Sequence, residues 1–187
     1  DALVAKNLKD GNTTPLYHYL SQPEVTEAEA SGRFCDMLHY TGCPGYIVHM
    51  TCEGALNAVR RSTQRNQKVF VETCSQYLMI DASLYEREDG YKWVMSPPLR
   101  EKKDQEALWA GINQGLVHVV GTDHCPFTIE QKMKGKDNFA KIPNGHPAIE
   151  HRMEFMYSEG VRKGKITPTK FVEICSTNAA KIFGMYP

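Results

Sequence analysis

The segment VVGTDHCPF, residues 119–127, carries an acid, an imidazole and a thiol in three consecutive positions directly after an apolar run. A short apolar run of this kind predicts a buried strand, so that Asp123 stands just beyond the strand's carboxyl end. The segment GYIVHMT ends a second apolar run with His49. Each strand would bring to the carboxyl edge of a sheet a side chain that can bind a metal or transfer a proton.

Both residues also have structural explanations. A histidine at a strand end is often a core residue bonded to the backbone, and an aspartate after a strand often caps the next turn. His124 and Cys125 are interpreted as residues that orient their neighbours or pack. Five further histidines have no partner at ligand spacing and are interpreted as structural or solvated: His18, His39, His118, His146 and His151.

Two turn segments and a lysine-rich segment are further candidates. VMSPPLR places Ser96 before two prolines, which favour extended backbone and either hold backbone groups towards a ligand or end a strand. KIPNGHP places Asn144 and Gly145 in a turn that could meet an amide-like substrate. KMKGKDNFAK, residues 132–141, is interpreted as a solvated loop face, with an anion-binding lid as the alternative.

Helical and strand patterns alternate along the chain. Apolar and capping patterns predict helices near 23–41, 52–65, 102–114, 148–162 and 168–182. They predict strands near 46–48, 68–74 and 115–123, with the strand-like segment YLMID at 77–81 following the second. Alternation without hairpin motifs predicts βαβ units, a parallel sheet and an α/β fold. Periodicity leaves open whether the sheet is closed into a barrel. The connection 123–147 is long for a compact domain and follows a strand end, which favours a functional loop.

Composition narrows the class of protein. The 22 basic and 22 acidic residues cancel, and no basic run with interleaved aromatics predicts nucleic-acid binding. No run approaches the roughly eighteen apolar residues of a membrane span, so no membrane partner is expected. The six cysteines are scattered and form no CxxC pair, which predicts reduced thiols and a cytoplasmic protein.

Seven blocks in order resemble the dihydropyrimidinase/hydantoinase branch of the amidohydrolase superfamily, from about residue 20 to the end: VHMTCEGA, VETCSQYLMID, MSPPLR, VGTDHCPF, KDNFAKIPNG, IEHRMEFMYSEGV and STNAAKIFGMYP. The resemblance implies a (β/α)8 TIM-type barrel with two divalent metals, usually zinc, at the carboxyl ends of its strands. It also implies a small cyclic amide substrate, a dihydropyrimidine or hydantoin opened to an N-carbamoyl amino acid, and a homotetramer.

The resemblance assigns roles to four residues. His49 would be the metal ligand on the sixth strand, and Asp123 would ligate the other metal and shuttle a proton. Ser96 and Asn144 would contact the cyclic amide, largely through backbone groups. Zinc chemistry is consistent with these roles, because a bound metal lowers the pKa of water and polarises the carbonyl under attack.

The sequence also departs from the family pattern. It contains no HxH pair and no candidate for the carbamylated lysine that bridges the two metals, and 187 residues are fewer than the roughly 250 of a complete barrel. Residues 1–187 are therefore expected to be a carboxyl-terminal part of the barrel, without a separate second domain, and inactive alone. Non-catalytic dihydropyrimidinase-related scaffold proteins, allantoinase and dihydroorotase are the alternatives. Because a scaffold has no need of both His49 and Asp123, the enzyme interpretation is preferred.

Overall fold

The computed structural model describes residues 2–187. Its three strands are β1 (Gly45–Ile47), β2 (Val69–Cys74) and β3 (Val119–Gly121). Its α-helices are α1 (Ala2–Lys9), α2 (Leu16–Leu20), α3 (Glu24–Thr41), α4 (Glu53–Thr63), α5 (Ser75–Met79), α6 (Lys102–Asn113), α7 (Ile129–Met133), α8 (Arg152–Phe155), α9 (Pro168–Val172) and α10 (Asn178–Ile182). Short 3-10 turns are η1 (Ala82–Glu86), η2 (Gly90–Trp93) and η3 (Phe139–Lys141), and π-helical stretches are η4 (Met156–Arg162) and η5 (Glu173–Thr177).

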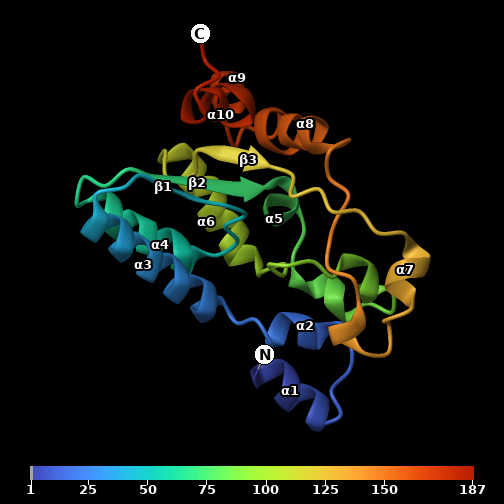
Figure 1. The fold of residues 1–187 in the computed structure, drawn as a ribbon. Coiled ribbons are helices and arrows are strands. Elements are labelled where there is room, and N and C mark those ends of the chain that lie inside the picture. Colours follow the sequence, from blue (N-terminus) through green and yellow to red (C-terminus); the bar gives the residue numbers. More distant parts are fainter. Residues whose placement is uncertain (1) are drawn as a thin grey trace.

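The strands form a parallel sheet in the order β1-β2-β3 (Figure 1). Ile47 of β1 pairs with Val71 of β2, and Cys74 of β2 pairs with Gly121 of β3. Helix α4 connects β1 to β2, and α5 and α6 lie between β2 and β3 in the sequence. This arrangement confirms the predicted α/β fold with a parallel sheet. Strands occupy the predicted positions near 46–48, 68–74 and 115–123. The strand-like interpretation of 77–81 is wrong, because Ser75–Met79 form helix α5 directly after β2.

The long helices form where the sequence provides boundaries and an apolar face. Helix α3 begins after Pro23 and ends at Gly42, whose φ of +70° is the left-handed conformation that glycine adopts at helix ends. Helix α4 buries Leu56 and Val59 on one face, and α3 packs against it. Helix α6 starts with a reciprocal capping box between Glu101 and Asp104.

The core lies between the sheet and these helices. Val71 and Val120 from the strands are fully buried together with Leu56 of α4 and Leu108 and Ile112 of α6. Such side chains each contribute about 1.5–3 kcal/mol on burial, so this layer fixes the strands that carry the site.

The predicted carboxyl-terminal helices are present, with local π-helical turns. Helix α8 continues into η4, and α9, η5 and α10 follow one another, with α8, α9 and α10 on the side of the sheet where β3 lies (Figure 1). The stretch η5 packs against β3. The long connection 123–147 contains α7 and η3 rather than loop alone. Its two ends meet, because His124 and His146 form an isolated parallel bridge.

No helix within residues 2–187 combines the length and apolar character needed to cross a bilayer. All six cysteines are free thiols. Four of them are buried: Cys35, Cys52, Cys74 and Cys175.

Candidate active site

The predicted acid and imidazole lie at the same edge of the sheet. His49 follows the end of β1 by two residues, and Asp123 follows the end of β3 by two residues. Because the strands are parallel, their carboxyl ends share one edge. Both residues have left-handed backbone, with φ of 38° and 48°. Such a conformation costs a non-glycine residue about 1–3 kcal/mol and is typical of functional sites, where neighbouring structure enforces it.

Hydrogen bonds to the neighbouring strand and helix hold the turn that carries His49. The amide of Met50 donates to the carbonyl of Glu72 over 2.8 Å, and the amide of Thr51 donates to Oε1 of Glu27 over 2.7 Å. His49 is half-buried and lines a largely apolar pocket of about 290 Å³. Pro97, the residue after Ser96, lines the same pocket. The His49 turn and the SPP segment therefore lie side by side.

The turn that carries Asp123 is held from both sides. Gln76 of α5 donates from Nε2 to the carbonyl of Thr122 over 3.2 Å. The amide of Cys125 donates to the carbonyl of His146 over 3.2 Å. The side chain of Asp123 is exposed at the end of this fixed turn.

His124 organises the loop after Asp123. Its Nδ1 accepts hydrogen bonds from the amides of Ala148 and Ile149, at 3.1 and 3.3 Å. This is the orienting role that the sequence suggested for the residue.

The segments that carry Ser96 and Asn144 contact each other. The amide of Gly145 donates to the carbonyl of Val94 over 3.1 Å, which places the NG turn beside the segment leading to Ser96. Ser96 and Asn144 are both exposed. His146, two residues after Asn144, forms a bridge with His124 beside Asp123. Backbone contacts thus connect the Asp123, Asn144 and Ser96 segments, and the residue after Ser96 lines the same pocket as His49.

Gly145 is required at its position by close packing. A Cβ there would stand 2.1 Å from the carbonyl oxygen of Cys125, which no side chain permits. The glycine of the NG turn thus allows the two ends of the long connection to meet.

Two supporting residues on α5 were not identified from the sequence. Gln76 fixes Thr122, as described above, and the hydroxyl of Tyr77 donates to the carbonyl of Pro97 over 2.9 Å. Burial raises the pKa of the Tyr77 hydroxyl well above its ordinary value, so it stays protonated and donates. The only indication in the sequence is the position of the pair directly after a strand end.

A buried charge network next to the turn that carries His49 was also not identified from the sequence. Arg100 donates from Nη2 to Oε2 of Glu27 over 3.1 Å and from Nε to Oγ1 of Thr51 over 3.0 Å. It also donates to the carbonyl of Gln22 over 2.5 Å, and its side chain is only 5% exposed. Thr51 in turn bonds to the same carboxylate. The network connects the end of the SPPLR segment to the turn that carries His49.

The interpretation of residues 132–141 as a solvated face is wrong for Lys132. Its side chain is buried, and Nζ donates to the carbonyls of Val94 (2.6 Å) and Pro143 (3.1 Å). Burial lowers the pKa of this lysine to about 8. The error arose because the acceptors come from residues 11 and 38 positions away in the sequence.

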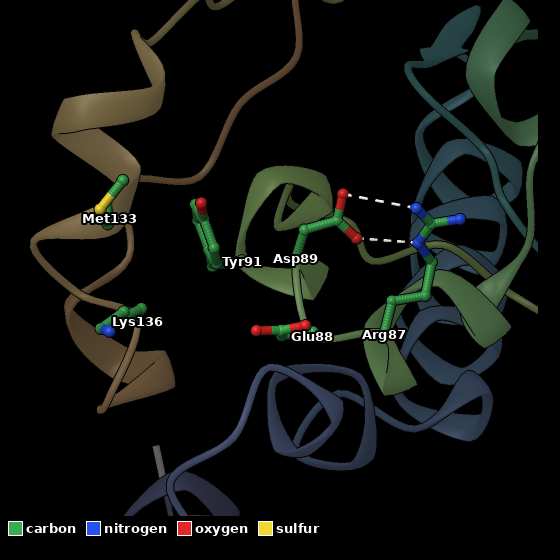
Figure 2. Close-up of a pocket in the computed structure, with 6 residues that line it drawn as sticks. All are labelled: Arg87, Glu88, Asp89, Tyr91, Met133 and Lys136. Carbon is green, nitrogen blue, oxygen red and sulfur yellow. Dashed lines mark hydrogen bonds and ion pairs between the residues drawn. The ribbon is translucent and has the colours of Figure 1, made fainter.

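A larger hollow of about 660 Å³ lies elsewhere, between the η1–η2 turn and α7 (Figure 2). Asp89 forms an ion pair with Arg87 at its wall, at 2.8 Å. It contains none of the four predicted site residues. We therefore place the candidate site at the carboxyl edge of the sheet.

The donor types at that edge fit a divalent metal, because imidazole and carboxylate are both zinc ligands. Their number does not, since a protein zinc site has at least three protein ligands and residues 2–187 contain no group of three or more His, Cys, Asp or Glu that could hold an ion. His49 and Asp123 therefore do not by themselves form a complete zinc site within residues 2–187.

The parallel sheet, with polar side chains gathered at its carboxyl edge, defines an α/β chain of the kind that binds ligands beyond its strand ends. The chain is homologous over its full length to D-hydantoinases and dihydropyrimidinases, which confirms the resemblance. No family model matches the sequence.

Two curated relatives match the whole chain. It is 44% identical over 190 residues to the D-hydantoinase of Geobacillus stearothermophilus and 43% identical over 193 residues to the D-phenylhydantoinase of Escherichia coli K12. It spans 40% and 42% of their respective lengths.

Solved structures agree with these relatives. The dihydropyrimidinase of Brevibacillus agri matches with a TM-score of 0.98 at 45% identity, over 100% of this chain and 41% of that one. The L-hydantoinase of Arthrobacter aurescens matches with a TM-score of 0.93 at 28% identity, again over 100% of this chain and 41% of that one.

Proposed function

We propose that residues 1–187 form the later part of the (β/α)8 barrel of a cyclic amide hydrolase, which opens dihydropyrimidine or hydantoin rings to N-carbamoyl amino acids. One observation carries the proposal. In a chain homologous throughout to hydantoinases, His49 and Asp123 both stand in left-handed backbone beyond the carboxyl ends of parallel strands.

Each residue has a role in this proposal. The Asp123 carboxylate takes a proton from the attacking water and gives it to the leaving ring nitrogen. Its exposure beyond β3 and the fixed Thr122 carbonyl behind it support that role. Backbone groups at Ser96 and Asn144 bind the amide face of the substrate. His49 and Asp123 would each contribute a ligand to a two-zinc centre whose other ligands, including a bridging carbamylated lysine, come from outside residues 2–187. Bound zinc would supply water of lowered pKa and a polarised carbonyl.

We further propose that the complete protein is a homotetramer in the cytoplasm. The resemblance to the hydantoinase family supports the tetramer, and the scattered, unpaired cysteines suit a reducing compartment. Light scattering of the complete protein tests the assembly, and a monomer would contradict it.

A chimera tests the function without depending on where this chain begins or ends. The aligned 190 residues of the Geobacillus stearothermophilus D-hydantoinase are replaced by this chain. We expect the chimera to open hydantoin and Asp123→Asn to lower kcat by about 10²–10⁴-fold, the usual contribution of a general acid–base group. His151→Gln is the matched control, since His151 is exposed and pairs with the neighbouring Glu154.

A folded, metal-loaded chimera that leaves hydantoin intact would refute the proposal. So would an Asp123→Asn variant with the activity of the parent chimera.

A further inference from the structure

The two proposed substrate segments share one buried anchor. Val94, two residues before Ser96, and Pro143, the residue before Asn144, both present their carbonyls to Nζ of Lys132. The two segments come from parts of the chain almost 50 residues apart. A single ammonium group therefore bridges them.

Lys132 is the buried residue of α7. Met133 and Lys136 line the open hollow and lie opposite Tyr91 in Figure 2. Lys132 does not line this hollow, and the residue is only 3% exposed. Its burial costs free energy unless its charge is well bonded, and the two carbonyls meet that need. A lysine placed for solubility alone would lie on the exposed side.

Other contacts limit the freedom of the same region. The amide of Gly145 donates to the Val94 carbonyl that Lys132 also binds. His18 of α2, itself buried, bonds through Nε2 to the carbonyl of Met95 over 2.7 Å. The amide of Phe139 donates to the carbonyl of Thr13 over 2.9 Å. The long connection is thus fixed at several points, with Lys132 at the junction of the two substrate segments.

We propose that Lys132 is a positioning residue, whose ammonium group holds the Ser96 and Asn144 segments in one relative position and so sets how a cyclic amide is bound. The effect on substrate depends on the proposed function. The effect on the two segments does not.

The first test measures hydrogen exchange by NMR on the 187-residue chain. In Lys132→Met we expect the Gly145 amide to exchange at least about tenfold faster, because its acceptor segment loses its anchor. Lys132→Gln, which keeps an uncharged donor, should be intermediate. Lys134→Met is the matched control, because Lys134 is exposed at the end of the same helix.

The exchange rate of the Val120 amide controls for global unfolding, because Val120 is fully buried in the sheet. Its exchange should be unchanged relative to the control. Unchanged Gly145 exchange in a folded Lys132→Met chain would overturn the proposal.

The second test measures kcat and KM for hydantoin in the chimera described above. Lys132→Met should raise KM more than it lowers kcat, with Lys132→Gln partly restoring KM. Equal KM in the variant and the parent would overturn the substrate-positioning role. If the parent chimera opens no hydantoin, the proposed function fails, while the exchange result still decides whether Lys132 joins the segments.

Discussion

Arg100 gives the sharpest prediction about how the site is held. Its side chain is 5% exposed, the Glu27 side chain is 15% exposed, and three bonds from Arg100 reach Glu27, Thr51 and Gln22. Replacing Arg100 by Met leaves a nearly buried carboxylate without its partner cation. Removing one member of a buried pair costs about 3–5 kcal/mol of unfolding free energy. That loss is a large part of the typical stability of a single domain, about 5–15 kcal/mol.

Urea unfolding of the chain, followed by circular dichroism, measures this cost. Arg33→Met is the matched control, because Arg33 pairs with Glu29 at 3.3 Å with both side chains about 60% exposed. An exposed i,i+4 pair of this kind contributes only about 0.3–0.5 kcal/mol. We expect the two variants to differ by at least about 2 kcal/mol, and Arg100→Lys to lie between them.

A double-mutant cycle separates the pair from the rest of the network. Glu27→Gln combined with Arg100→Met should cost less than the sum of the single changes, by about 0.5–3 kcal/mol, because the double variant leaves no unpaired charge. Strict additivity, or an Arg100→Met cost equal to that of Arg33→Met, would refute the view that this network holds the His49 turn.

Three further predictions concern Gly145, the pair His18 and His146, and the activity of the isolated chain. Gly145→Ala should lower the free energy of unfolding by about 1–3 kcal/mol, because the new Cβ meets the Cys125 carbonyl. The control Gly32→Ala in α3 meets only Ala58 at 3.8 Å and should stabilise the helix by about 0.5–1 kcal/mol. Equal unfolding midpoints of the two variants would contradict this prediction. Burial lowers the pKa of His18 and His146 in the folded chain below the ordinary value of 6.5. The unfolded chain therefore binds more protons than the folded chain as the pH falls through 6.5. The free energy of unfolding should fall with the pH, by up to about 1.4 kcal/mol per pH unit for each histidine. His18→Gln should flatten that slope in urea titrations at pH 5–7, and an unchanged slope would argue against a buried neutral His18. The isolated 187-residue chain is expected to open no dihydrouracil or hydantoin above a metal-only background, and turnover by the purified chain would refute that expectation.

The sequence predicted the parts of the fold that local pattern controls. Apolar runs located all three strands, and the helical pattern near 23–41 matches α3. The positions of His49 and Asp123 at one sheet edge followed from parallel topology. The left-handed backbone of both residues did not, because neighbouring strands and helices enforce it.

The buried charges could not be predicted for a related reason. Lys132 and Arg100 look like surface residues in the sequence, and their acceptors lie up to 78 positions away. Only the folded arrangement of α7 and of the SPPLR segment shows that they are buried. Gln76 and Tyr77 were missed in the same way, since their partners, Thr122 and Pro97, lie on other segments.

The metal content of the chimera tests most directly whether His49 and Asp123 serve one centre. Elemental analysis of the purified, dialysed protein should find about two divalent ions per chain in the parent and in His151→Gln, and fewer in His49→Gln and in Asp123→Asn. A full complement of metal in both site variants would contradict the account.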